Sequence, residues 1–267
     1  MTVPHHSTAG HPLDVVVDIE GTTSATGFIT EQLYPYSRKH FARIIEERGT
    51  EPDVARAVAA VRDHITATAT DAATDTATGP AAGPAAEPAT DTAAVVAALN
   101  AWLDRDEKAT PLKTLQGAIW AEGFASGELT SHFYPDAIPA LRAWHAAGHR
   151  LYVFSSGSVS AQLAWFGNSA EGSLLPLFSG HFDTENAGPK KTPGAYDAIA
   201  AEIGAAPSGI VFLSDLVDEL DAAREAGWHT VGVRRPGEPY YDRGVGTHPE
   251  TDSFARVDLT GDRPVVR

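Results

Sequence analysis

The chain has no cysteine, only one methionine, and no apolar run that approaches the roughly 20 residues needed to cross a bilayer. The absence of cysteine excludes disulfides, thiolate metal sites and cysteine nucleophiles, so any catalytic metal must be held by oxygen or imidazole ligands. Residues 1–11 have neither a basic start nor an apolar stretch, which predicts a flexible leader and not a secretory signal. We therefore expect a cytoplasmic protein without a membrane segment.

Basic residues are also scarce. The chain has 20 lysines and arginines against 35 aspartates and glutamates, and its formal net charge is −15. Binding to nucleic-acid phosphates requires a basic face, so this balance argues against a nucleic-acid partner. An anionic substrate would need local positive charge, from a metal ion or a well-placed lysine. With 267 residues, 43% of them hydrophobic, the chain can form a packed core in one large domain or two modest ones.

Short apolar runs rich in β-branched residues indicate buried strands of a parallel sheet. They cover residues 13–17, 151–154, 210–213 and 230–233. The stretches 135–147, 193–203 and 218–226 between them are helical in pattern, and Gly148 and Gly227 stand where helices would end. This alternation predicts an α/β fold with a doubly wound parallel sheet.

Residues 28–126 interrupt the alternation with helical patterns over 32–47, 53–65, 92–102 and 111–122. We interpret 28–126 as an all-helical cap, inserted into a core that comprises residues 12–27 and 127–267. Within the cap, residues 66–92 consist almost entirely of Ala, Thr, Asp, Gly and Pro. This composition predicts a disordered low-complexity loop, whose Ala-rich ends could extend the flanking helices.

Polar side chains follow three of the predicted strands, at the edge where open α/β sheets bind their ligands. A lysine lies in a loop shortly before a predicted helix. The set comprises Asp18, Glu20, Ser155, Ser156, Lys190 and Asp215. Carboxylates, hydroxyls and a lysine on one rim are the groups that carboxylate-mediated phosphoryl transfer requires.

The chemistry explains why these residue types belong together. A dianionic phosphate ester repels an attacking carboxylate, and Mg²⁺ held between carboxylates offsets that repulsion. A lysine and a hydroxyl bind the non-bridging oxygens, where charge must be stabilised in the transition state. Attack by the carboxylate forms an aspartyl phosphate, which water then hydrolyses. An acid two residues along the chain can protonate the leaving oxygen and later activate the water.

Each residue also has an ordinary structural explanation. Asp18 and Asp215 could be turn or capping residues after strands, Ser155 and Ser156 could cap the next helix, and Lys190 could be surface charge beside Lys191. Asp218 and Glu219 fit the acidic first turn of a helix. The ordered combination of these signals, and no single residue, is what favours a catalytic site.

The ordered motifs resemble the haloacid dehalogenase superfamily, and within it the enolase-phosphatase (acireductone synthase) branch of methionine salvage. The similar stretches include VVVDIEGTTSATGFITEQLYPY, PLKTLQGAIWAEGFASGEL, GHFDTENAGPKKTPGAYDAIA and IVFLSDLVDELDAAREAGWHTVGVRRPG. The resemblance covers nearly the whole chain from Asp14 to about Gly237, apart from the low-complexity tract. The glutamate of DIEGTT is typical of this branch, whereas most of the superfamily has aspartate there.

The resemblance implies a role for each residue of the set. Asp18 would be the nucleophile and a magnesium ligand. Glu20 would be the second acid and would reach the metal through its backbone carbonyl. Asp215 would be the remaining magnesium ligand. The phosphate would be held by Ser155, Ser156 and Lys190.

The resemblance further implies a cytoplasmic monomer with one Mg²⁺ per subunit. Its substrate would be a small phosphate ester, 2,3-diketo-5-methylthiopentyl 1-phosphate, which is first enolised and then dephosphorylated. Two alternatives remain open. One is a phosphatase or mutase of the same superfamily that acts on another small phosphate ester. The other is a receiver-like signalling domain, which would be far shorter and would lack the cap.

Overall fold

The computed structural model describes residues 12–75, 89–261 and 263–267, and the predicted leader 1–11 lies outside them. The chain divides into two compact units. The core unit comprises the segments up to Ile29 and from Thr130 onward, and the helical unit comprises Thr30–Leu129. The predicted cap, 28–126, starts two residues and ends three residues earlier in the chain than this helical unit.

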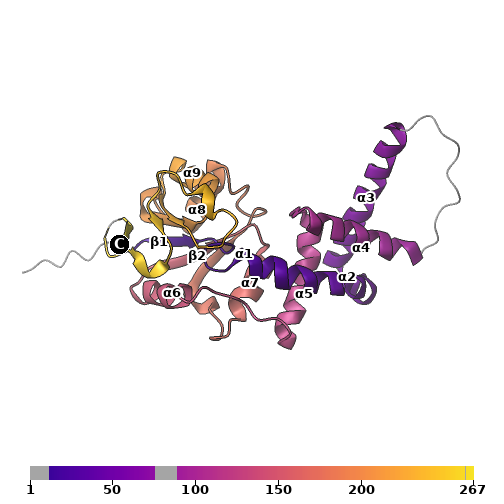
Figure 1. The fold of residues 1–267 in the computed structure, drawn as a ribbon, viewed down its shortest axis with the longest axis horizontal. Coiled ribbons are helices and arrows are strands. Elements are labelled where there is room, and N and C mark those ends of the chain that lie inside the picture. The colour runs from indigo at the N-terminus through magenta and orange to yellow at the C-terminus, as the bar shows by residue number, and fades with distance from the viewer. Residues whose placement is uncertain (1–11, 76–88, 262) are drawn as a thin grey trace, which may run out of the picture. The chain divides into compact units, whose positions relative to one another are not determined.

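Within the described residues, the core unit contains a six-stranded parallel sheet with the order β3-β2-β1-β4-β5-β6. The strands are β1 (Asp14–Val17), β2 (Arg150–Phe154), β3 (Phe178–Phe182), β4 (Ile210–Ser214), β5 (His229–Val233) and β6 (Glu250–Thr251). Helices α6 (Ala137–Ala146) and α7 (Val159–Gly167) lie on one face, and α8 (Pro193–Ile203) and α9 (Val217–Glu225) lie on the other (Figure 1). The predicted doubly wound α/β fold is confirmed.

The apolar runs form strands because the sheet is covered on both faces. Val16, Phe154 and Phe212 project into one layer of the core with Tyr196 of α8 and Leu220 of α9. All five side chains are fully buried. Burial of that kind contributes roughly 1.5–3 kcal/mol for each large apolar side chain.

The predicted strands lie within one or two residues of the observed ones, but β3 was not predicted. Its sequence, FSGHF, contains glycine and histidine, and most of its residues are only half-buried because it forms one edge of the sheet. A β-ribbon of β7 (Val257–Asp258) and β8 (Val265–Val266) follows the main sheet. Short 3₁₀ turns lie at Leu175–Leu177, Pro207–Gly209, Tyr241–Arg243 and Phe254–Arg256.

The helical unit contains no strand among residues 30–75 and 89–129, as the sequence pattern predicts. The chain reaches it through α1 (Thr26–Phe28) and a π-helical turn (Ile29–Leu33). Its helices are α2 (Tyr34–Arg48), α3 (Pro52–Asp75), α4 (Ala89–Asp104) and α5 (Thr110–Ser126). They bury one apolar core, which includes Phe41, Ile44, Val61, Val95, Leu99, Leu115 and Ile119.

The low-complexity tract 66–92 is helical at both ends, as its alanine-rich ends allowed. Helix α3 continues to Asp75 and α4 begins at Ala89, so residues 66–75 and 89–92 are helical. Alanine has the highest helix propensity, and the hydroxyls of Thr66 and Thr68 donate hydrogen bonds to carbonyls one turn earlier. Residues 76–88 of the predicted loop lie outside the described residues.

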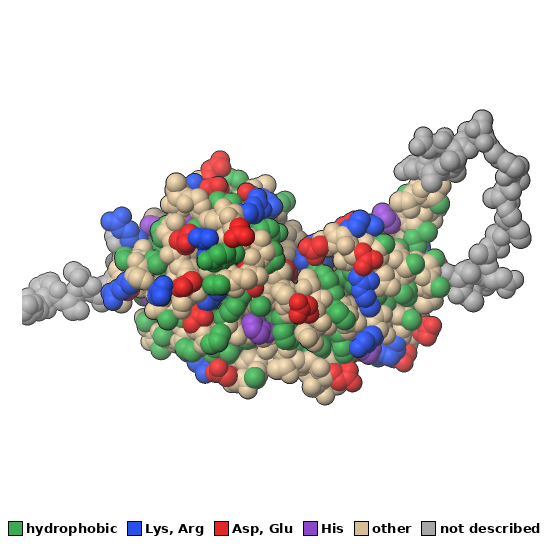
Figure 2. Space-filling model, in the orientation of Figure 1, with side chains coloured by type: hydrophobic (Ala, Val, Ile, Leu, Met, Phe, Trp, Pro, Cys, Tyr) green, Lys and Arg blue, Asp and Glu red, His purple; other side chains and the backbone are tan. Residues whose placement is uncertain are grey.

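None of the helices in the described part of the chain is both long and apolar enough to cross a membrane. On the face of the molecule shown in Figure 2, the lysine and arginine side chains of the described residues are scattered among acidic ones. This face therefore presents no continuous basic surface of the kind that nucleic-acid backbones require.

Candidate active site

The carboxyl ends of three neighbouring strands bring most of the predicted site residues to one rim of the sheet. Val17 of β1 is in register with Val153 of β2 on one side and with Leu213 of β4 on the other. Asp18 extends β1 by one residue, and its amide donates to the Leu213 carbonyl over 3.0 Å. Asp18 therefore lies between the ends of β2 and β4, where Ser155 and Asp215 emerge.

Lys190 forms a buried double ion pair at this rim. Its Nζ lies 2.8 Å from Oδ1 of Asp18 and 2.7 Å from Oε2 of Glu219. The ammonium also lies over the ring of Phe154, 5.5 Å from its centroid. Lys191, in contrast, is exposed and pairs with Asp218 over 3.4 Å. The structure thus distinguishes two adjacent lysines that the sequence could not separate securely.

The turn after β1 explains the glycine of DIEGTT. The amides of Thr22, Thr23 and Ser24 all donate to the carbonyl of Ile19, which reverses the chain directly after Asp18. Gly21 has a φ of +69°, and a Cβ atom on it would lie 2.2 Å from Oδ2 of Asp215. Only glycine permits this close approach between the turn and the second carboxylate. Glu20 is half-buried in the same turn.

The two serines after β2 occupy different environments. Ser155 is buried, and its hydroxyl accepts a 3.3 Å hydrogen bond from the amide of Gly157, so its proton can be donated to a ligand. Ser156 is half-buried. Neither serine caps α7, because Ser158 is the residue that accepts the hydrogen bond of a first-turn amide, that of Ala161. The capping explanation for Ser155 and Ser156 is therefore excluded.

The electrostatics of the rim are those of crowded buried carboxylates. Burial raises the pKa of Asp18 to about 6, although Lys190 opposes the rise. Burial, followed by the charges of Asp18 and Glu219, raises the pKa of Asp215 to about 8. Burial alone would lower the pKa of Lys190, but the two carboxylates outweigh it and raise that pKa. One ammonium thus faces three acids, and the rim lacks positive charge.

This donor set fits a hard divalent cation. Among the described residues, no group of three or more His, Cys, Asp and Glu side chains has the arrangement of a metal site. Mg²⁺, however, takes only one or two protein carboxylates and completes its shell with water and substrate oxygens. The carboxylates of Asp18 and Asp215, with their raised pKa values, are suited to such an ion.

Glu219 is the site residue that sequence analysis interpreted only as part of an acidic helix start. It is buried, and besides pairing with Lys190 it accepts a 3.0 Å hydrogen bond from the Ser214 hydroxyl. The only signal in the sequence was proximity, because Glu219 lies in the first turn of α9, four residues after Asp215, which itself precedes the helix.

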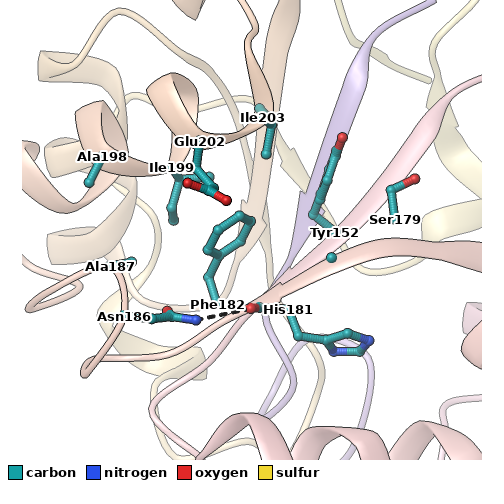
Figure 3. A pocket seen from close by; sticks show the side chains of 11 residues that line it. Tyr152, Ser179, His181, Phe182, Asn186, Ala187, Ala198, Ile199, Glu202 and Ile203 are labelled. Atoms are coloured by element: carbon teal, nitrogen blue, oxygen red, sulfur yellow. Dashed lines mark hydrogen bonds between the residues drawn. The ribbon is translucent and has the colours of Figure 1, made fainter.

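A separate cleft of about 650 Å³ lies beside the edge strand β3 (Figure 3). Phe182 and Tyr152 of the sheet and Ile199 and Glu202 of α8 form its walls. The amide group of Asn186 donates to the outward-facing carbonyl of His181 over 3.2 Å. None of the six predicted site residues lines this cleft, so it is not part of the rim described above.

Comparison with known proteins gives a consistent answer. The model of the haloacid dehalogenase-like hydrolases matches residues 15–227. The Enolase-phosphatase E1 of Streptomyces avermitilis is 58% identical, over 92% of this chain and 94% of its own. The chain belongs to the Enolase-phosphatase E1 family of haloacid dehalogenase-like hydrolases. The resemblance inferred from the motifs is thereby confirmed.

Other relatives extend the likeness. The Enolase-phosphatase E1 of Saccharopolyspora erythraea is 48% identical, over 92% of this chain and 95% of its own. Among solved structures, the UTR4 protein of Saccharomyces cerevisiae superposes with a TM-score of 0.66 at 26% identity, covering 91% of this chain and 98% of that one. The family therefore spans both units of the chain and is not limited to the core unit.

Proposed function

We propose that the protein is an enolase-phosphatase of methionine salvage, which converts 2,3-diketo-5-methylthiopentyl 1-phosphate into the acireductone and inorganic phosphate. The observation that carries the proposal is the buried contact between Asp18 and Lys190 at the end of β1, in a chain 58% identical to an Enolase-phosphatase E1. In this proposal Asp18 is the nucleophile, and its attack on phosphorus forms an aspartyl phosphate.

Lys190 has two tasks in this mechanism. It holds the Asp18 carboxylate in one orientation. Its positive charge also stabilises the phosphate oxygens while the Asp18 oxygen bonds to phosphorus and the leaving oxygen departs. Glu219 keeps the ammonium in position from the other side. We assign the non-bridging phosphate oxygens to Ser155 and Ser156, whose strand end adjoins that of Asp18.

Glu20 is proposed as the acid that protonates the leaving oxygen and then activates the water that hydrolyses the aspartyl phosphate. It stands two residues after the nucleophile, in a turn that Gly21 keeps close to Asp215. The same rim would serve the enolisation, because proton removal next to a carbonyl also creates an oxyanion that needs positive charge beside it.

One Mg²⁺ per subunit would be held by the carboxylates of Asp18 and Asp215 and the backbone carbonyl of Glu20. When bound, it would supply the positive charge that the rim lacks, at both the phosphate and the developing oxyanion. The monomeric state and the cytoplasmic location implied by the family resemblance also remain predictions.

The test is to incubate the protein with the diketo phosphate, with and without Mg²⁺, while ultraviolet absorbance and phosphate release are followed together. We expect an enol-type absorbance change that precedes phosphate release, and neither signal without Mg²⁺. Efficient hydrolysis of other phosphate esters, with no reaction of the diketo phosphate, would leave only a general phosphatase of this superfamily.

A further inference from the structure

Residues Thr22–Thr26, which begin inside the turn after β1, are each hydrogen-bonded to a residue elsewhere in the core unit. We refer to Thr22–Thr26 as the strut. Buried side chains from other parts of the core unit, Arg235 and Glu238, form hydrogen bonds to its two ends. Its first carbonyl, that of Thr22, accepts from the Arg235 guanidinium over 3.1 Å. The carbonyl of Thr23 accepts from the Tyr134 amide over 2.9 Å.

The middle of the strut is fixed by His132 and Trp165. The Ser24 hydroxyl donates to the carbonyl of His132 and accepts a 3.1 Å bond from the Trp165 indole. The next amide, that of Ala25, donates to Nδ1 of His132 over 3.2 Å. The imidazole also stacks on Phe28, with the ring centroids 5.4 Å apart. Burial lowers the pKa of His132, which keeps Nδ1 available as an acceptor.

The far end of the strut is fixed by Glu238, which follows β5. Both of its carboxylate oxygens lie 3.2 Å from the amide of Thr26, the first residue of α1. One of them also accepts a hydrogen bond from the Tyr134 hydroxyl. Glu238 is buried, so these bonds are protected from competition with water.

The strut is bonded directly to the turn that contains Glu20. The amide of Gly21 donates to the carbonyl of Ser24 over 2.8 Å, and Glu20 and Ser24 form a parallel β-bridge. Movement of the strut would therefore move Glu20. A displacement of about 1 Å in a catalytic group is enough to slow proton transfer substantially.

We propose that His132 and Glu238 are positioning residues for Glu20: they hold the strut, and the strut sets the place from which Glu20 protonates the leaving oxygen. The proposal rests on the acid role proposed for Glu20 above. It concerns proton donation to the leaving group and leaves the attack by Asp18 unchanged.

The test compares two esters of nearly equal size, phenyl phosphate and p-nitrophenyl phosphate. Phenolate needs a proton as it leaves, whereas nitrophenolate does not. In Glu238→Ala and His132→Phe, kcat/KM for phenyl phosphate is expected to fall about tenfold or more, because general acid catalysis is weakened. For p-nitrophenyl phosphate the change in kcat/KM is expected to stay within about threefold, since kcat/KM reports only the steps up to phenol release and that leaving group needs no acid; hydrolysis of the aspartyl phosphate, which is common to both esters, does not enter it.

Matched variants separate positioning from charge and from general damage. Glu238→Gln removes the same charge but keeps an acceptor oxygen. It is therefore expected to keep much of the wild-type ratio of kcat/KM for phenyl phosphate to kcat/KM for p-nitrophenyl phosphate. Glu250→Ala removes an exposed carboxylate that pairs with Arg234, and it is expected to leave the ratio unchanged. Hydrogen exchange at the amides of Ala25 and Thr26 is expected to quicken in His132→Phe and Glu238→Ala respectively.

The proposal would be overturned if kcat/KM fell equally for both esters in Glu238→Ala and His132→Phe, or if the ratio of the two values stayed at its wild-type level in both variants. So would unchanged exchange at the amides of Ala25 and Thr26, whatever the activity. If the wild-type protein hydrolyses neither ester nor the diketo phosphate, the proposed function itself fails, and the exchange data alone decide whether His132 and Glu238 hold the strut.

Discussion

Replacement of Asp215 by Asn is expected to stabilise the protein in the absence of metal while it abolishes activity. Asp215 is only 7% exposed and faces the charges of Asp18 and Glu219, with one ammonium nearby. Without a metal ion, burial and these two charges disfavour the ionised form of the Asp215 carboxyl. The asparagine keeps the shape of the side chain and removes the charge.

The magnitude follows from the raised pKa. A folded-state pKa of about 8 against the ordinary 3.8 means that the folded protein binds this proton more tightly than the unfolded chain does. The contribution of this proton to the free energy of unfolding is therefore fully present below pH 3.8 and is lost as the pH rises toward 8. At pH 7 the unfolded chain has released this proton and the folded protein still holds it, which lowers the stability by about 4 kcal/mol relative to acidic pH. A new buried amide costs about 1–2 kcal/mol, so the expected net gain is about 2–3 kcal/mol.

The assay is urea unfolding of the wild type and Asp215→Asn, with EDTA, at pH 5 and pH 7. At pH 5 the two proteins are expected to have nearly equal stability, because the penalty is then only about 1–2 kcal/mol. At pH 7 the variant is expected to be more stable. Mg²⁺ at about 100 times its dissociation constant should stabilise the wild type by about 2.7 kcal/mol and the variant far less.

Asp183 provides a matched control. It is also a buried acid at the end of a strand, but its carboxylate accepts hydrogen bonds from the amides of Val159, Glu185 and Asn186. Asp183→Asn is therefore expected to destabilise the protein at both pH values. If Asp215→Asn is less stable than the wild type at pH 7 in EDTA, or if the difference in unfolding free energy between the two proteins does not change with pH, the Asp215 carboxyl does not destabilise the metal-free fold.

Three further changes have expected outcomes. Lys190→Met leaves Asp18 and Glu219 unpaired in a buried site. We expect the free energy of unfolding in urea to fall by about 3 kcal/mol, the opposite of the change in Asp215→Asn, and turnover to be lost. Gly21→Ala places a Cβ atom 2.2 Å from Oδ2 of Asp215 at a φ of +69°, so activity should vanish. A Gly21→Ala variant that keeps wild-type activity would argue against this geometry. EDTA should abolish phosphate release and added Mg²⁺ should restore it, whereas activity that survives chelation would exclude the proposed metal.

The sequence was sufficient to predict the strands that are buried on both faces. Their β-branched runs, such as DVVV before Asp18, have no other stable environment in a chain of this composition. The edge strand β3 was missed because most of its residues are only half-buried and it contains glycine and histidine. The end of α3 could not be placed from the sequence, which left open an extension of the helix into the tract, because a composition typical of disorder is equally rich in alanine, the strongest helix former.

The candidate site was predicted as a set of residue types at strand ends, because parallel strands bring their carboxyl ends to one rim. The sequence could not show which of two adjacent lysines turns inward. That is decided by the packing of Lys190 over Phe154 and by its two buried acids. Nor could it show that Glu238, 220 residues after Asp18, bonds to Thr26, since this contact depends on the tertiary fold.

The central claim is that Asp18 attacks phosphorus and carries the phosphate covalently. The most direct test is to quench the protein in acid during turnover, reduce acyl phosphates with borohydride and locate the product by peptide mass spectrometry. We predict homoserine at position 18, and none in Asp18→Asn, whose turnover should fall by several orders of magnitude. Turnover with no modified residue at position 18, or with the phosphate trapped on another residue, would contradict the account.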